Sequence, residues 1–219
     1  MELFEFKTED SFFHENGFHL TSDISRIGKI IVHYELYKKI INLPGNVVEC
    51  GVFKGNSLIR WGTFRELFEN KLSRKIIGFD VFGDFPETDF EEDKELRENF
   101  VTTSGTPIAL DELQTVLDFK KMENCELVKG NVLETIPEYI DNNPQLRISL
   151  LHIDIDVYEP AKIILEKFWD HIVPGGVIVL DDYGIFPGET KAVDEFITDK
   201  NVIINKFPFG HASASYIIK

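Results

Sequence analysis

Short runs of apolar residues alternate along this chain with segments in which apolar positions recur at helical spacing. The apolar runs are continuous rather than alternating, which indicates strands of a parallel sheet covered by helices on both faces. The predicted strands are residues 46–50, 75–80, 125–129, 147–154 and 176–182. The predicted helices are residues 21–43, 57–69, 108–122, 132–140, 160–171 and 189–199.

The end of the chain departs from this alternation. Residues 201–207 and 212–219 are two further apolar runs, joined by a short turn that includes His211. Strands joined so closely pair antiparallel, because a parallel pair needs a longer crossover. We therefore predict an α/β fold with a doubly wound, mostly parallel seven-stranded sheet, helices on both faces and a C-terminal antiparallel hairpin.

We expect residues 1–219 to form a single domain with two additions. The first addition is residues 1–45, a phenylalanine-rich, irregular start followed by a helix, which we expect to act as a lid or to contact other copies in a homo-oligomer. The second is residues 81–107, an irregular acidic insertion that we expect to form part of a pocket. Its acidic run, residues 87–98, is expected to be a solvated face.

Composition and charge narrow the classes of partner. The chain has 38 acidic residues against 23 lysines and arginines, a net charge of −15, and 43% hydrophobic residues. An acidic surface repels nucleic acid and anionic membranes, so we expect neither as a partner; a cation or a positively charged cofactor fits better. Cys50 and Cys125 lack zinc-ligand spacing, and no secretory signal or membrane span is recognisable. We expect a cytoplasmic protein.

Ligands of open α/β sheets bind at the carboxyl ends of the strands, so the residues that follow each strand matter most. After the first strand, Gly51 and Gly55 bracket a tight turn into a helix, where the backbone can approach a ligand closely. Glu49 at the strand end would repel a phosphate but suits the ammonium group of S-adenosylmethionine (SAM). The alternative is an ordinary turn in which Glu49 is paired elsewhere.

Asp80 ends the second strand and could bind the hydroxyls of a ribose. It lies 29 residues beyond Gly51, and the chain has no G-x-G-x-x-G, which disfavours an NAD enzyme. The alternative is that Asp80 caps its strand end. After the third strand, Asn131 could bind the edge of an adenine, or it could be a helix N-cap.

Carboxylates follow the fourth and fifth strands, which should be neighbours. Asp154, Asp181 and Asp182 would then repel one another at one rim unless a hard divalent cation such as Mg²⁺ neutralised them. The alternative is that some of them cap helices; we expect this of Asp156, ahead of the helix that begins at residue 160. His152 is expected to be a buried histidine with satisfied hydrogen bonds.

Several stretches together carry a resemblance to a known family: VVECGVFKGNS, GFDVFGDFPET, LLHIDIDVYEPAK, VPGGVIVLDDYG and PGETKAVDEF. They resemble the macrocin O-methyltransferases, over residues 21–196. The resemblance implies the class I, Rossmann-like methyltransferase fold and a SAM- and Mg²⁺-dependent enzyme that methylates a hydroxyl of a sugar or glycosylated metabolite.

The resemblance also implies roles for particular residues. Asp154, Asp181 and Asp182 would hold the metal, with Asp154 as the base. The SAM site would include the following residues: Glu49, Gly51, Val52, Gly55, Ser57, Asp80 and Asn131. Two alternatives stay open: a metal-dependent methyltransferase for catechols or other phenols, and a SAM-binding subunit without catalysis.

Overall fold

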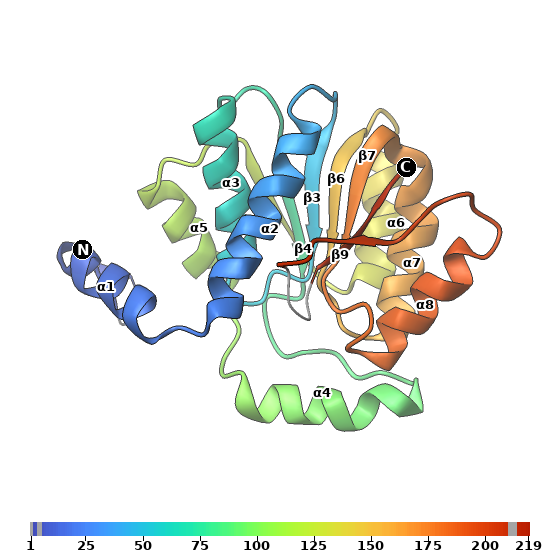
Figure 1. Ribbon diagram of the computed structural model, residues 1–219, viewed down its shortest axis with the longest axis horizontal. Helices are drawn as coiled ribbons and strands as arrows, with labels where there is room; N and C mark the ends of the chain where they lie inside the picture. Colours follow the sequence, from blue (N-terminus) through green and yellow to red (C-terminus); the bar gives the residue numbers. More distant parts are fainter. Residues whose placement is uncertain (1, 4–5, 210–213) are drawn as a thin grey trace.

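The computed structural model describes residues 2–3, 6–209 and 214–219. Its main sheet has seven strands in the order β5-β4-β3-β6-β7-β9-β8 (Figure 1). The parallel strands are β3 (Asn46–Cys50), β4 (Ile76–Asp80), β5 (Cys125–Lys129), β6 (Ile148–Ile153) and β7 (Ile172–Leu180). From β3 the chain adds strands toward one edge of the sheet, and from β6 it adds them toward the other. β3 and β6 are therefore neighbours at the point where the direction reverses, and a ligand can bind between their carboxyl ends.

The C-terminal strands are antiparallel, as predicted. β9 (Ser215–Ile218) lies between β7 and β8 (Asn205–Lys206) and pairs antiparallel with both. The expected turn residue His211 lies outside the described residues. The predicted fold class is confirmed by this mixed, mostly parallel sheet.

Helices cover the sheet on both faces because successive strand residues point to opposite sides. One apolar core lies under α2 (Ile24–Ile40), α3 (Asn56–Phe68) and α5 (Leu110–Phe119). The other lies under α6 (Val132–Asn142), α7 (Tyr158–Phe168) and α8 (Pro187–Ile197), with the 3₁₀ turn Trp169–His171 after α7. No helix in the described part of the chain has both the length and the apolar character of a membrane span.

Two segments that we expected to be irregular contain helices. Within the insertion, α4 (Glu91–Thr103) begins with three acidic residues, which favour a helix start because they oppose the positive end of the helix dipole. Near the N-terminus, α1 (Ser11–Thr21) follows the strand pair Glu2–Leu3 and Phe6–Lys7 and the 3₁₀ turn Thr8–Asp10. None of its residues is buried, and it extends away from the body of the molecule (Figure 1).

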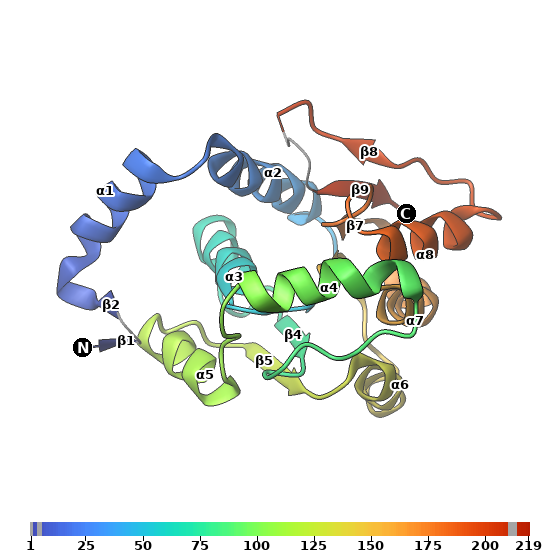
Figure 2. The same ribbon diagram turned by 90° about the horizontal axis from the view of Figure 1, so that it is seen from below.

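The acidic insertion is anchored by one of its own carboxylates. α4 crosses the molecule at the carboxyl ends of the strands, as seen from below in Figure 2. Asp93 in its first turn is fully buried and accepts hydrogen bonds from the backbone N–H groups of Tyr158 (3.0 Å) and Gly188 (2.7 Å). A single carboxylate therefore caps α7 and α8 and fixes α4, so the expectation of a wholly solvated acidic face is wrong at Asp93.

Candidate active site

A cleft of about 1300 Å³ opens at the carboxyl ends of the strands. Its walls come from the turn after β3, residues 81–86, α4, residues 103–107 and the segments after β6 and β7. Parallel strands bring their carboxyl ends to one edge, so residues far apart in sequence share this cleft.

The turn after β3 is locked against the end of β6. Gly51 has φ +89°, and a Cβ placed there would lie 1.7 Å from the backbone carbonyl oxygen of Asp154. The Asp154 N–H donates in turn to the Cys50 carbonyl oxygen (3.0 Å). Only glycine fits this close approach, so the turn and the first carboxylate of the cleft are held in one fixed arrangement.

Asp80 organises the same turn from the neighbouring strand. Its Oδ2 accepts from the N–H groups of Val52 (2.7 Å) and Phe53 (3.0 Å), and its Oδ1 accepts from Phe82 (2.6 Å). Asp80 is therefore a cap at its strand end, and it also lines the cleft. Gly55, with φ +78°, is the N-cap residue of α3.

Glu49 lies in the core rather than on the cleft wall. It is fully buried, its Oε1 accepts from the Ser57 hydroxyl (2.7 Å), and its Oε2 lies 3.5 Å from His152 Nδ1. Of the two interpretations, the ordinary turn with Glu49 paired elsewhere describes the structure. Ser57 lines the cleft, and Glu49 orients its hydroxyl.

Asn131 is the N-cap of α6. Its side-chain oxygen accepts from the Leu133 N–H at 3.0 Å, as the capping alternative predicts. Asn131 also lines the cleft. The oxygen is engaged in the cap, so any recognition of a base edge would fall to the amide nitrogen.

Three carboxylates converge at the rim: Asp154, Asp156 and Asp182 offer oxygens that all lie within 4.8 Å of one another. Burial and mutual repulsion raise their pKa values, to about 7 for Asp154 and about 6 for Asp156. Asp156 is not the helix cap that we expected, because it has φ +65° and the α7 N-cap is Val157, without a side-chain capping bond. Its side chain joins the cluster instead.

Asp181 lies beside this cluster but has different partners. Its Oδ2 accepts from Lys29 Nζ at 2.5 Å, and the same ammonium lies 3.7 Å from Asp154 Oδ2. Although burial by itself raises the pKa of Asp181, Lys29 and His152 lower it below its usual range. The three residues expected to hold a metal are thus adjacent, with Asp154 and Asp182 in one cluster and Asp181 paired with Lys29.

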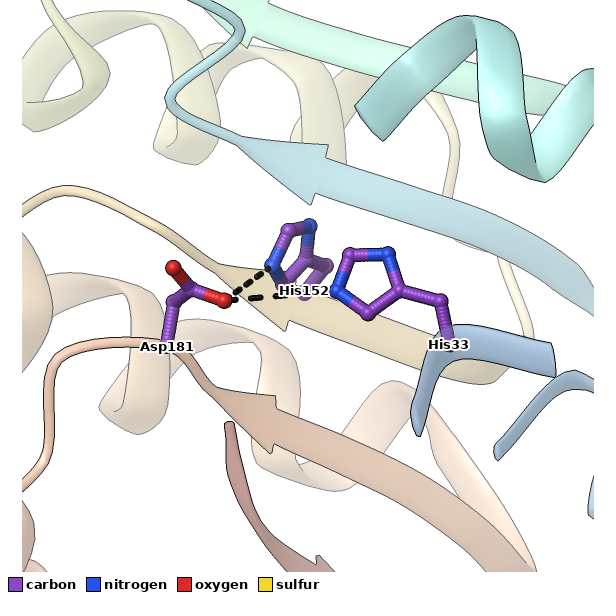
Figure 3. Close-up of side chains that lie close together, drawn as sticks. All are labelled: His33, His152 and Asp181. Carbon is purple, nitrogen blue, oxygen red and sulfur yellow. Dashed lines mark hydrogen bonds and ion pairs between the residues drawn. The ribbon is translucent and has the colours of Figure 1, made fainter. Parts of the chain in front are cut away.

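His33 of α2 and His152 of β6 both face the Asp181 carboxylate (Figure 3). Their Nε2 atoms lie 4.0 and 3.5 Å from its Oδ1. Arg60 Nη1 contacts His33 Nδ1 at 3.0 Å; a guanidinium can only donate, so the neutral His33 carries its proton on Nε2. This proton faces Asp181. The two histidines therefore surround the Asp181 carboxylate and are not arranged as ligands of a transition metal.

His152 is buried among partners, as predicted. Although burial lowers its pKa, the neighbouring carboxylates of Asp181 and Glu49 raise it to about 10. Sequence reasoning missed three other contributors: Lys29, Arg60 and Glu189. Glu189 in α8 is fully buried, and its Oε1 accepts from the Asp182 N–H at 3.2 Å. Lys29 and Arg60 occupy helix positions without a motif, and Glu189 lies in the stretch PGETKAVDEF without an expected role, so only the packing of helix on sheet reveals all three.

The donor set fits a hard divalent cation. Asp182 Oδ2 is buried without a hydrogen-bond partner among the described residues, next to two further carboxylates whose pKa values burial has raised. A cation with oxygen ligands would neutralise all three. Gly51 of the glycine turn and Asp80 line the same cleft, where a nucleoside-bearing cofactor could lie against the backbone.

Comparison with known proteins gives relatives of similar sequence. The chain is 25% identical over 147 residues to the 8-demethyl-8-(2,3-dimethoxy-α-L-rhamnosyl)-tetracenomycin-C 4′-O-methyltransferase of Streptomyces olivaceus. It is 24% identical over 174 residues to the demethyldecarbamoylnovobiocin O-methyltransferase of Streptomyces niveus. These alignments cover 65% and 75% of this chain but only 54% and 64% of the two relatives.

A calicheamicin methyltransferase of known structure superposes with a TM-score of 0.80 at 26% identity, over 98% of this chain and 86% of the other. This likeness confirms the class I methyltransferase fold. The profile of the macrocin O-methyltransferase (TylF) family matches residues 34–207, most of the described sheet and its helices. With the fold and the family profile in agreement, the chain belongs to the macrocin O-methyltransferase family.

Proposed function

We propose that this chain is a SAM-dependent, Mg²⁺-dependent O-methyltransferase that acts on a hydroxyl group of a sugar or glycosylated metabolite. Family membership supports methyl transfer to oxygen. The name of the Streptomyces olivaceus relative describes methylation of a rhamnosyl group, which supports a sugar acceptor.

One observation carries the proposal: a single cleft joins the glycine turn to the carboxylate cluster. Gly51 contacts the backbone of Asp154 directly, so a donor bound against the turn and an acceptor bound at the carboxylates would be held next to each other. Methyl transfer needs this alignment, because most of its catalysis comes from orientation of the two reactants.

The proposed cation ligands are Asp154, Asp181 and Asp182. Asp182 Oδ2 is buried without a hydrogen-bond partner among the described residues, and Asp154 and Asp181 already face one positive charge, the Lys29 ammonium. Asp156 is the competing candidate for the third position, because its oxygen lies within 4.8 Å of those of Asp154 and Asp182. Loss of a true ligand should weaken Mg²⁺ binding about 100-fold or more, above the cost of losing an outer partner.

When bound, SAM would supply an activated methyl group, and Mg²⁺ would acidify and orient the acceptor hydroxyl as a Lewis acid. Asp154 is the proposed base that takes the hydroxyl proton. Burial and the charge of Asp181 raise its pKa to about 7, near the value that favours proton transfer at neutral pH. Its side chain is 27% exposed, so it can reach an acceptor in the cleft.

The two additions to the domain have proposed roles at the acceptor end. Arg97, Phe100 and Val101 of α4 line the cleft, which supports residues 81–107 as part of the acceptor pocket. Phe18 of α1 also lines it, which supports a lid function for residues 1–45. The exposed apolar side chains Phe12, Phe13 and Leu20 suit contacts with another copy of the chain, as in the homo-oligomer that we expect.

The test is methyl transfer from SAM to a panel of rhamnose-bearing glycosides and catechols, with and without EDTA. We expect activity on the glycosides that EDTA abolishes and Mg²⁺ restores. Asp154→Asn should be inactive, whereas Asp170→Asn, which removes an exposed carboxylate far from the cleft, should be unaffected. Full activity in EDTA or in Asp154→Asn would refute the metal and base assignment, and methylation of catechols alone would favour the phenol alternative.

A second measurement decides the third ligand. Mg²⁺ is titrated calorimetrically into Asp156→Asn and Asp181→Asn. We expect the larger loss of affinity in Asp181→Asn; a loss confined to Asp156→Asn would transfer the ligand role to Asp156.

A further inference from the structure

Several cationic side chains of the cleft have no carboxylate partner among the described residues. Five cationic side chains line it: Arg26, Lys29, Lys54, Arg60 and Arg97. Among the described residues, Lys29 alone of these five has a carboxylate within 4.0 Å. Six aspartates also line the cleft, yet within the described residues none of them pairs with the other four cations, which leaves these cations open to an anion that arrives with a ligand.

Arg60 is fixed in position but keeps donors free. It lies in the second turn of α3, half-buried, and its one hydrogen-bond partner among the described residues is His33 Nδ1, at 3.0 Å. This bond uses one of the five N–H groups that a guanidinium offers. Burial lowers the pKa of Arg60, and Glu49, Asp181 and Asp154 counter that effect from a distance. The alternative role for Arg60 is therefore to balance these buried acids.

Arg26 faces the same part of the cleft from α2. It lies three positions before Lys29 and seven before His33, so the three side chains share one face of the helix. Its side chain is exposed and has no partner within the described part of the chain. The positive charge of Arg26 lowers the pKa of Arg60. The two guanidinium groups are therefore close enough to repel each other when no anion lies between them.

We propose that Arg26 and Arg60 form a subsite in the cleft that binds an oxyanion, a carboxylate or a phosphate, of a bound small molecule. An anion between two guanidinium groups would relieve their repulsion and accept several charge-assisted hydrogen bonds. Both residues line the same cleft as the carboxylate cluster, so the anion would share this cleft with the proposed cation. The role of this subsite in catalysis rests on the proposed function.

Two molecules could supply the oxyanion. The amino-acid part of SAM ends in a carboxylate. A sugar acceptor that is still attached to a nucleoside diphosphate would bring phosphates instead. In either case, loss of one guanidinium should weaken binding of the anionic molecule about 10-fold or more, the effect of losing a charge-assisted hydrogen bond.

The experiment is calorimetric titration of three probes into the full chain: S-adenosylhomocysteine, methylthioadenosine and thymidine diphosphate. Methylthioadenosine is the control for the first, because it lacks the carboxylate. The variants are Arg26→Gln, Arg60→Gln and Arg60→Lys. The charge-matched control is Lys71→Gln, which removes a half-buried cation paired with Glu123 outside the cleft.

A SAM carboxylate in the subsite predicts that Arg26→Gln and Arg60→Gln weaken S-adenosylhomocysteine binding, with methylthioadenosine unchanged. A phosphate there predicts loss of thymidine diphosphate binding instead. Arg60→Lys should recover part of either affinity. Unchanged affinity for both anionic probes in Arg26→Gln, a variant whose folding should not suffer, would overturn the proposal.

The same titrations separate this proposal from the methyltransferase function. If the wild-type chain binds thymidine diphosphate but neither adenosyl probe, the anion subsite stands and the proposed function fails. If the wild-type chain binds S-adenosylhomocysteine and all variants do so equally, without thymidine diphosphate binding, the proposed function stands and the subsite is refuted.

Discussion

Replacement of Gly51 by alanine tests the arrangement on which the whole cleft depends. The new Cβ would lie 1.7 Å from the Asp154 carbonyl oxygen, whereas ordinary contacts begin at 3.4 Å. The end of β6 would have to move by about 1.7 Å relative to β3, although the N–H groups of both residues are held by backbone hydrogen bonds, Gly51 to Phe79 and Asp154 to Cys50. This shift would displace Asp154, which is both a proposed metal ligand and the proposed base.

The cost of Gly51→Ala has two parts. A residue with a side chain at φ +89° costs roughly 1–2 kcal/mol. The overlap with backbone adds roughly 1–3 kcal/mol or more, as in overpacked cores. The total is about 2–5 kcal/mol, and in a chain of this size each kcal/mol lowers Tm by roughly 2–4 °C.

Gly184→Ala is the matched control, because Gly184 has φ +84° and nothing within 4 Å of a Cβ built there. It should lose only the conformational part, about 1–2 kcal/mol. Urea unfolding measures both variants, and calorimetry measures their binding of S-adenosylhomocysteine and Mg²⁺. We expect Gly51→Ala to be less stable and to lose both ligands. Equal stability of the two variants, or full ligand binding by Gly51→Ala, would refute the reasoning.

Two further predictions concern the anchor of α4 and the pH dependence. Asp93→Ala removes two charge-assisted hydrogen bonds of 3.0 and 2.7 Å, at a cost of about 2–4 kcal/mol, and should release α4, which proteolysis and hydrogen exchange would detect; unchanged protection of α4 would contradict this role. In metal-free protein, Asp154 and Asp156 have pKa values raised to about 7 and about 6, so the folded state holds their protons more tightly than the unfolded state does. Their stabilising effect is complete below a pH of about 4 and is lost as the pH rises through about 7. Tm in EDTA should therefore fall over this window, and Mg²⁺ should restore it at neutral pH; a rising Tm in EDTA would contradict the raised pKa values.

Much of the fold could be predicted from the sequence because its signals are local. Continuous apolar runs mark β3, β4, β5, β6 and β7, and the short final connection marks the antiparallel pair. α1 and α4 were not predicted because almost none of their residues is buried. A helix without a buried apolar face shows no periodic pattern of apolar residues in its sequence. α4 instead depends on Asp93, whose partners lie 65 and 95 residues away.

The sequence by itself determined which chemistry gathers at the rim. Residues that follow parallel strands lie together at the carboxyl edge of the sheet. The glycine turn, Asp80 and several aspartates therefore had to lie in one site. Only the tertiary structure decided how these charges pair. Lys29 reaches Asp181 across 152 positions of sequence, Glu49 turns into the core toward Ser57, and Asp156 joins Asp154. The physical reason is that pairing depends on where α2, α3 and α8 settle on the sheet to within a few ångströms, and no local pattern in the chain encodes that distance.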